Sequence, residues 1–397
     1  MTAFPELLQA GAELTAWRHD LHAHPELAYE ERRTAALVAQ RLKDWGYTVE
    51  EGVAGTGVIG WLQCGRSSRA IGLRADMDAL PVAEENRFAH ASRHAGRMHA
   101  CGHDGHTVML LGAARQLATE RRFDGRVVLI FQPAEERGAG AQRMVQAGLF
   151  ERHPCEAVFA LHNWPGLPFG HFGLRAGPMM AGTNGFCISL LGRSAHAAMP
   201  HLGVDALMVA CHVALALQLL VARERDPLAP AVLTITQIHA GDTMNTLAQR
   251  AELRGTVRVF DEATLDRLEA GLRRMANATA AAHGAQAQIE FSRNYPPLHN
   301  PAAEVARASA VMRELVGDAA VHTDIAPSMA AEDFAYLLRE RPGCYAFLGS
   351  GEGSHRLPGH GEGPCELHSG SYDFNDALLP LGASYFVLLA RRLLARS

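Results

Sequence analysis

The stretch Val127-Val-Leu-Ile-Phe131 carries an unbroken row of apolar side chains and runs directly into Gln132-Pro-Ala-Glu135-Glu136. A strand with one wet face would alternate apolar and polar residues, so this run predicts a central strand covered on both faces. Other short apolar runs recur on either side of it, separated by stretches with helical spacing: Val58–Leu62, Ala70–Arg74 and Ala157–Leu161. This rhythm predicts the α/β class, with a largely parallel sheet covered by helices.

Polar side chains follow these strands at the point where each one ends. Asp76 and Asp78 follow the run from Ala70, Glu135 and Glu136 follow the run from Val127, and His162 follows the run from Ala157. In open α/β sheets ligands bind outside the carboxyl ends of the strands. We therefore expect these residues to share one cleft.

A second polar cluster, Cys101-Gly-His103-Asp104-Gly-His106, opens a helical stretch. A thiolate with imidazoles suits zinc, and nearby carboxylates also admit manganese, cobalt or nickel. Cys101 has no Cys-x-x-Cys partner, which favours a catalytic metal over a structural one. For Asp104 and His106, binding metal, orienting a ligand and capping the helix remain open.

The paired carboxylates of Glu135 and Glu136 point in different directions at a strand end. One can bind metal while its neighbour faces the substrate and acts as a general base. His162 could equally be a metal ligand or a core histidine. His368, among serine and glycine residues near the C-terminus, is undecided from the residues alone.

Length, charge and cysteine content limit the classes of binding partner that the protein is expected to have. The length of 397 residues favours two domains, and a formal charge of -5 without a long basic run argues against nucleic acid or a membrane surface. Small molecules are therefore the expected partners. Seven scattered cysteines and an N-terminus without a secretory pattern predict a cytoplasmic protein. The apolar segment Leu207–Ala222 predicts a buried helix rather than a membrane span.

The sequence changes character at Gly177–Gly182. Strand and helix patterns from 183 to 294 form a compact α+β set, and the Asn294–Pro297 turn then returns the chain. We predict one domain from 1–182 and 295–397, with 183–294 inserted into it. Near the N-terminus, Leu14–Trp45 shows helical spacing up to Gly46.

Taken together, the motifs resemble the metal-dependent aminoacylase/carboxypeptidase family. Within it the chain is similar to the branch of hippurate hydrolases, N-acyl-amino-acid amidohydrolases and indole-acetyl-amino-acid hydrolases. The resemblance runs in matching order from Arg18 to Asp376. Its motifs are Arg74-Ala-Asp76-Met-Asp78-Ala-Leu-Pro81, Cys101–His106, Gln132–Glu136, Leu161-His162-Asn-Trp164 and Leu367–Asp376.

The resemblance implies two divalent metal ions per subunit, Mn²⁺ or Zn²⁺ first and Co²⁺ or Ni²⁺ as alternatives. The implied ligands are Cys101, His103, Glu136, His162 and His368. Cys101 takes the bridging position that a carboxylate holds in relatives outside this branch. Glu135 is the implied general base, and Asp76 is a carboxylate that orients a ligand.

The resemblance also assigns roles in the inserted domain, which serves as a dimerisation and lid domain. His196 reaches across a homodimer to the substrate of the other subunit, while Asn245 and Arg258 bind substrate. The implied activity is hydrolysis of N-acyl amino acids to a carboxylic acid and an amino acid. A dipeptidase or carboxypeptidase with the same site, and a non-catalytic ligand-binding homologue, are the alternatives.

Overall fold

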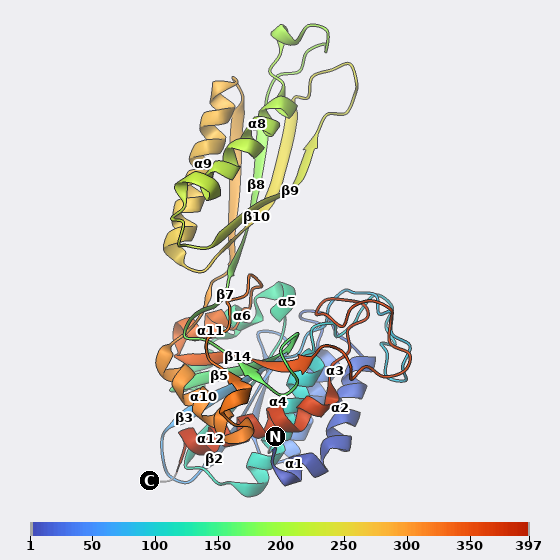
Figure 1. Ribbon diagram of the computed structural model, residues 1–397, viewed down its shortest axis with the longest axis vertical. Coiled ribbons are helices and arrows are strands. Elements are labelled where there is room, and N and C mark those ends of the chain that lie inside the picture. The colour runs from blue at the N-terminus through green and yellow to red at the C-terminus, as the bar shows by residue number, and fades with distance from the viewer. Residues whose placement is uncertain (1–2, 396–397) are drawn as a thin grey trace. The chain divides into compact units, whose positions relative to one another are not determined.

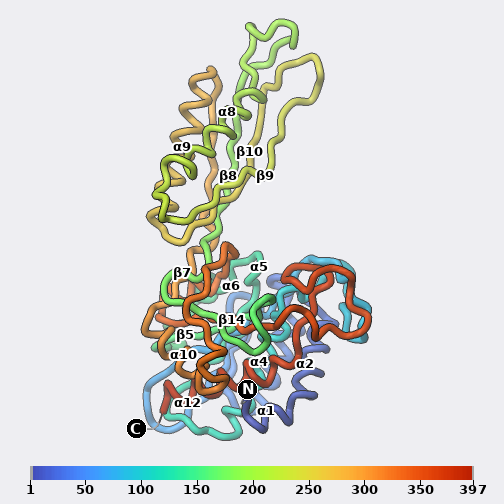
Figure 2. The backbone as a smooth tube through the Cα atoms, in the orientation of Figure 1, coloured from blue at the N-terminus to red at the C-terminus, as the bar shows by residue number. Residues whose placement is uncertain are grey.

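The computed structural model describes residues 3–395, which fall into two compact units (Figures 1 and 2). Unit 1 comprises residues up to 179, 299–326 and the chain from 333 onward. Unit 2 comprises 180–298 and 327–332. The chain passes between the units along β7 (Gly177–Met180) and β12 (Leu298–Asn300), which pair with each other.

Unit 1 is built on an eight-stranded sheet of order β1-β2-β4-β3-β5-β14-β6-β13. Its neighbours β3–β4, β3–β5, β5–β14 and β6–β13 are parallel, and the other pairs are antiparallel. The strands are β1 (Thr48–Val53), β2 (Gly57–Cys64), β3 (Ala70–Asp76), β4 (Gly125–Gln132), β5 (Ala157–Pro165), β6 (Phe172–Gly173), β13 (Val321–His322) and β14 (Gly343–Gly351). The predicted α/β class with a largely parallel sheet is confirmed.

Helices cover both faces of this sheet. Figure 1 shows α6 and α11 on one side and α4, α10 and α12 on the other. All residues of β3 are buried, as expected for an apolar run without alternation. The helices of unit 1 are α1 (Pro5–Gln9), α2 (Gly11–Ala23), α3 (Arg32–Asp44), α4 (His103–Glu120), α5 (Glu135–Gly138), α6 (Gly140–Gln146), α7 (Leu149–Arg152), α10 (Ala302–Val316), α11 (Ala335–Glu340) and α12 (Leu379–Leu393).

The prediction of helix over Leu14–Trp45 is wrong in its middle. Helix α2 ends at Ala23 and α3 begins at Arg32, so residues 24–31 form a non-helical connection. Pro25 removes a backbone donor and disfavours helical geometry at His24, whose φ of -129° and ψ of 59° leave the helix. Tyr29 within the connection has a positive φ of 63°.

Unit 2 is a four-stranded antiparallel sheet of order β11-β8-β10-β9 with two helices against one face. Asp205 and Asp261 cap the two helices through their carboxylates. The strands are β8 (Gly182–Leu191), β9 (Ala231–Ala240), β10 (Arg250–Val259) and β11 (Gln286–Tyr295), and the helices are α8 (Ala206–Leu219) and α9 (Glu262–Ala282).

Helix α8 is extended to Glu224 by a π-helical turn. By length and composition it could span a membrane, but the core helices of globular proteins can be equally long and apolar. Val209, Val213 and Leu217 are buried against the sheet of unit 2. In the single chain, however, Leu215 is 70% exposed and Met208 50%. The expectation of a buried helix therefore holds for only one of its faces.

Candidate metal centre

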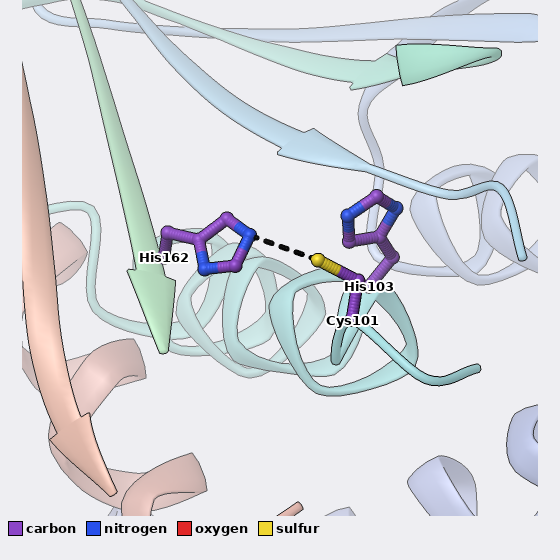
Figure 3. A group of neighbouring side chains, drawn as sticks. All are labelled: Cys101, His103 and His162. Atoms are coloured by element: carbon purple, nitrogen blue, oxygen red, sulfur yellow. Dashed lines mark hydrogen bonds between the residues drawn. The ribbon is translucent and has the colours of Figure 1, made fainter. Parts of the chain in front are cut away.

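Cys101 and His103 are held together by Gly102 at the start of α4 (Figure 3). Gly102 has a φ of 94°, in the left-handed region that favours glycine. A Cβ there would lie 2.2 Å from Asn163 Oδ1, so glycine is required for space as well as conformation. The turn directs the thiol and the imidazole toward His162 of β5.

The five ligands implied by the resemblance fall into two of the five clusters of close ligand atoms in the described chain, and Cys101 belongs to both of these two. Its Sγ lies 3.4 Å from His162 Nε2 (Figure 3). The first group is Cys101, His103 and His162, and the second is Cys101, Glu136 and His368. Within each group the ligand atoms lie within 4.8 Å of one another. A thiolate shared in this way can bridge two cations.

Hydrogen bonds fix how the two imidazoles face the centre. His162 Nδ1 donates to Asn163 O at 2.7 Å, which leaves Nε2 as the lone-pair atom facing Cys101. His103 Nδ1 lies 3.2 Å from Asp78 Oδ1. Contacts of this kind orient metal-binding imidazoles in proteins.

Two atoms of the centre are buried without a hydrogen-bond partner among residues 3–395. They are His103 Nε2 and Glu136 Oε1, the latter lying 3.2 Å from His368 Nε2 without hydrogen-bond geometry. Buried polar atoms in native proteins are normally satisfied, so an orphan pair needs an explanation. A divalent cation bound by thiolate, imidazole and carboxylate would satisfy both, and the donor set fits one.

Burial and neighbouring carboxylates set the protonation states of the candidate ligands. Burial lowers the pKa of His162 well below its usual range, with His106 adding to the effect, so this imidazole is neutral. Burial also opposes the charged form of His103, but Asp76, Asp78 and Glu136 outweigh it and raise its pKa to about 10. Burial, with nearby carboxylates, raises the pKa of the Cys101 thiol well above its usual range. A cation must therefore displace protons from Cys101 and His103.

Both ring nitrogens of His106 and one carboxylate oxygen of Asp104 are engaged by neighbouring groups. His106 Nδ1 lies 2.6 Å from Asp76 Oδ1, and its Nε2 contacts the amide oxygen and the backbone N–H of Asn163. Asp104 Oδ2 lies 2.8 Å from His22 Nδ1. Of the roles left open, the geometry favours orientation of neighbouring groups. Asp76 contacts His106 Nδ1 through Oδ1 and accepts from Arg74 through Oδ2, and its role as an orienting carboxylate stays a prediction.

Glu135 and Glu136 lie on a four-residue helical turn, α5, directly after β4. Their backbone N–H groups donate to the two carboxylate oxygens of Asp78, each at 3.0 Å. Ala134, just before the turn, has a positive φ of 53°. This bend places the side chain of Glu136 with the ligands and keeps Glu135 beside them, 6% exposed.

His368 reaches the centre from the C-terminal part of the chain. Its backbone N–H donates to Ala100 O at 2.7 Å, and its Nε2 lies 3.2 Å from Glu136 Oε1. Its φ is 65°, a conformation that costs roughly 1–3 kcal/mol in a non-glycine residue and that clusters at functional sites. The side chain of this candidate ligand is 55% exposed in the single chain.

The structure adds supporting residues to which the sequence assigned no role. Arg74 is buried and donates to Asp76 at 2.6 Å and to Asp333 at 3.2 Å. Asp333 also accepts from Gln132 at 2.7 Å and from Ala141 N at 2.9 Å. The one visible signal was an acidic pair, Glu332-Asp333, before a short helix.

In unit 2 the structure brings His196 and Asn245 together and leaves Arg258 apart from them. His196 pairs with Thr246, and Asn245 O accepts from Ala197 N at 2.9 Å. His196 Nδ1 accepts from Ala198 N at 3.0 Å, so its exposed Nε2 carries the proton. Arg258 lies at the opposite end of β10, beside Thr183, roughly 27 Å from Arg250 at the strand rise.

The sequence profile of peptidase family M20/M25/M40 matches residues 72–363. The chain belongs to the M20/M25/M40 peptidase family. It is 38% identical over 397 residues to the hippurate hydrolase of Campylobacter jejuni, covering 99% of this chain and 100% of the relative. It is 41% identical over 291 residues to an N-acyl-L-amino acid amidohydrolase of Geobacillus stearothermophilus, covering 72% and 78% of the two chains.

A crystal structure of another M20 member, a dinuclear metal-binding peptidase from Bacillus subtilis, superimposes with a TM-score of 0.83. It is 31% identical and covers 98% of this chain and 99% of its own. The M20 assignment supports a divalent metal at the centre around Cys101. The expected family resemblance is confirmed.

Proposed function

We propose that the protein is a metal-dependent amidohydrolase that cleaves N-acyl amino acids to a carboxylic acid and a free amino acid. The observation that carries this proposal is the pair of ligand groups sharing Cys101, with Glu135 as an additional carboxylate beside them. Relatives named for hippurate and N-acyl-L-amino acid hydrolysis support the substrate class. The proposed occupants are two ions, Mn²⁺ or Zn²⁺ first, then Co²⁺ or Ni²⁺.

Bound cations supply Lewis acidity toward water and the substrate carbonyl. Glu135 takes a proton from the attacking water and later gives it to the departing amine nitrogen. Water thus adds its oxygen to the acyl carbon, the C–N bond breaks, and both product groups receive their protons. The backbone N–H of Asp333 lies 3.4 Å from Glu135 Oε1 and helps to hold this carboxylate in place.

His196 and Arg258 complete the proposed chemistry. The protonated Nε2 of His196 donates to the oxyanion that develops on the carbonyl, an interaction worth about 10²- to 10³-fold in turnover. The guanidinium of Arg258 binds the α-carboxylate of the amino acid part. Asn245, beside His196, contacts the same end of the substrate as His196 does.

We propose a homodimer in which His196 and Arg258 at one site come from different subunits. In one chain they lie at opposite ends of β10, a separation far longer than a small N-acyl amino acid. Strand β9 is an edge of its sheet, and the groove between it and α8 is lined by apolar residues including Leu215, Leu233 and Ile238. An exposed apolar edge of this kind favours pairing with a second copy.

Mixed dimers of two inactive variants are expected to regain activity. Glu135→Gln and His196→Ala each disable a homodimer. Co-expressed with different tags, they form heterodimers in which one site combines Glu135 of one subunit with His196 of the partner subunit. About a quarter of all sites in the mixture are then intact. Inactivity of a purified heterodimer would contradict the shared site.

The substrate class is tested with metal-free protein reloaded with Mn²⁺, Zn²⁺, Co²⁺ or Ni²⁺. Each form is assayed on N-acetyl, N-benzoyl and N-indoleacetyl amino acids and on dipeptides. We expect hydrolysis of at least one N-acyl series and none after chelation. Failure of every metal to support hydrolysis would overturn the proposed function.

A dipeptidase or carboxypeptidase activity is the second candidate, because the Bacillus subtilis relative is named a peptidase. Preference for dipeptides over N-acyl amino acids in the same assay would favour it. We also propose a cytoplasmic location. The seven cysteines, all free, support a reducing compartment.

A further inference from the structure

The connection between α2 and α3 is anchored next to the candidate metal centre. Glu26 O accepts from Ala79 N at 2.8 Å, one residue after Asp78. The Glu26 carboxylate accepts from Arg33 N and Thr34 N, each at 2.8 Å, and so fixes the start of α3. The residues between, 27–31, are held at both ends.

Glu31 closes the start of the turn that carries Glu135 and Glu136. Its side chain is fully buried, with Oε1 accepting from Ala134 N at 2.8 Å and Oε2 accepting from Thr56 Oγ1 at 2.5 Å. Ala134 is the residue with the positive φ at the head of the turn. The Glu31 side chain, through Oε1, therefore holds the backbone in a conformation that is unfavourable for a non-glycine residue.

Tyr29 closes the other end of the same turn. Its hydroxyl donates to Gly138 O at 2.5 Å. Its ring packs so closely on Gly138 that a Cβ there would lie 2.5 Å from Tyr29 Cε2, and the Arg143 guanidinium lies 4.2 Å from the ring centroid. Burial raises the pKa of Tyr29 to about 12, so the hydroxyl keeps its proton at neutral pH.

We infer that Tyr29 and Glu31 are positioning residues that clamp the two ends of the turn bearing Glu135 and Glu136. Turn α5 has four residues and cannot hold itself by helical hydrogen bonds alone. The Asp78 carboxylate accepts from the backbone N–H groups of Glu135 and Glu136. Glu31 and Tyr29 hold the backbone on either side, at Ala134 and Gly138. The inference rests on the proposed role of Glu135, because a displacement of about 1 Å at a reacting group can cost 10²-fold in rate.

Tyr29→Phe, Glu31→Ala and Glu31→Gln test the clamp. Tyr47→Phe is the matched control, because Tyr47 is buried in the same unit and its hydroxyl donates to Ala114 O at 2.9 Å. We expect kcat to fall about 10- to 100-fold in Glu31→Ala and several-fold in Tyr29→Phe, with KM little changed. Glu31→Gln keeps an oxygen for Ala134 N and should rescue most of kcat. Tyr47→Phe should lower only the melting temperature.

Amide hydrogen exchange over residues 133–140 gives a readout independent of activity. We expect faster exchange there in Tyr29→Phe and Glu31→Ala, but not in Tyr47→Phe. Exchange equal to that of the control, or Glu31→Gln as impaired as Glu31→Ala, overturns the clamp. If the wild-type protein hydrolyses no amide, the proposed function fails, and the exchange measurement still decides whether the clamp exists.

Discussion

Replacing Glu135 by glutamine is expected to lower kcat by about 10²- to 10⁴-fold while the metal content stays at the wild-type level. Glutamine keeps the shape of the side chain and can still accept from Asp333 N, but it cannot take a proton from water. In the proposal Glu136, with Cys101 and His368, is the metal ligand and Glu135 the base, so the ions are expected to lose no donor in this variant. Steady-state kinetics measures the fall in kcat, and metal analysis of the same sample measures whether the metal content is unchanged.

Glu136→Gln is the matched comparison, since it changes the neighbouring residue in the same way. It removes a charged ligand, so metal content and activity should fall together. A Glu135→Gln protein with near-normal turnover would remove Glu135 from the mechanism. A Glu135→Gln protein that loses its metal would instead make Glu135 a ligand.

Replacing Cys101 by alanine is expected to abolish activity and to weaken the binding of both ions. Cys101 is the residue common to the two ligand groups, so its loss removes a donor from each. Residues that merely orient a ligand already change metal affinity by about 10- to 100-fold, and we expect a larger loss here. Calorimetric titration with Mn²⁺ or Zn²⁺ measures it.

Cys344→Ala is the control, because Cys344 is also a buried free cysteine of unit 1 but belongs to neither ligand group. It should lower stability and leave metal binding unchanged. Retention of two tightly bound ions by Cys101→Ala would rule out the bridge. Proton release on metal binding should also be smaller in Cys101→Ala, because the buried thiol no longer gives up a proton.

Much of the sheet could be predicted because its central strands are apolar without interruption. The run Val127–Phe131 lies within β4, and Ala157–Leu161 lies within β5. A predicted strand ends too early where a polar residue continues the observed strand. The predicted strand from Ala70 ended at Arg74, whereas β3 continues to Asp76. The two-residue strands β6 and β13 carry no periodic pattern and are found only through their pairing.

The candidate ligands could be predicted only in part from spacing. Cys101 and His103 lie in one turn, but His162 and His368 reach them from distant segments, and the family resemblance was needed to select them. The connection at 24–31 was hidden within an apparent helix, so the contacts of Tyr29 and Glu31 with the turn at 134–138 had no signal in the sequence. Such contacts depend on tertiary structure rather than local pattern.

The sequence of unit 1 is interrupted by that of unit 2, which determines when the parts of unit 1 become available during synthesis on the ribosome. Strand β14 lies between β5 and β6 in the sheet order, yet about 180 residues, including all of unit 2, are translated between β5 and β14. At roughly 5–20 residues per second, about 10–40 s pass between the translation of β5 and that of β14. Unit 2 is almost continuous in sequence and can fold during that interval. The candidate metal centre includes His368 as a potential ligand, so it can be complete only after the segment around residue 368 has emerged.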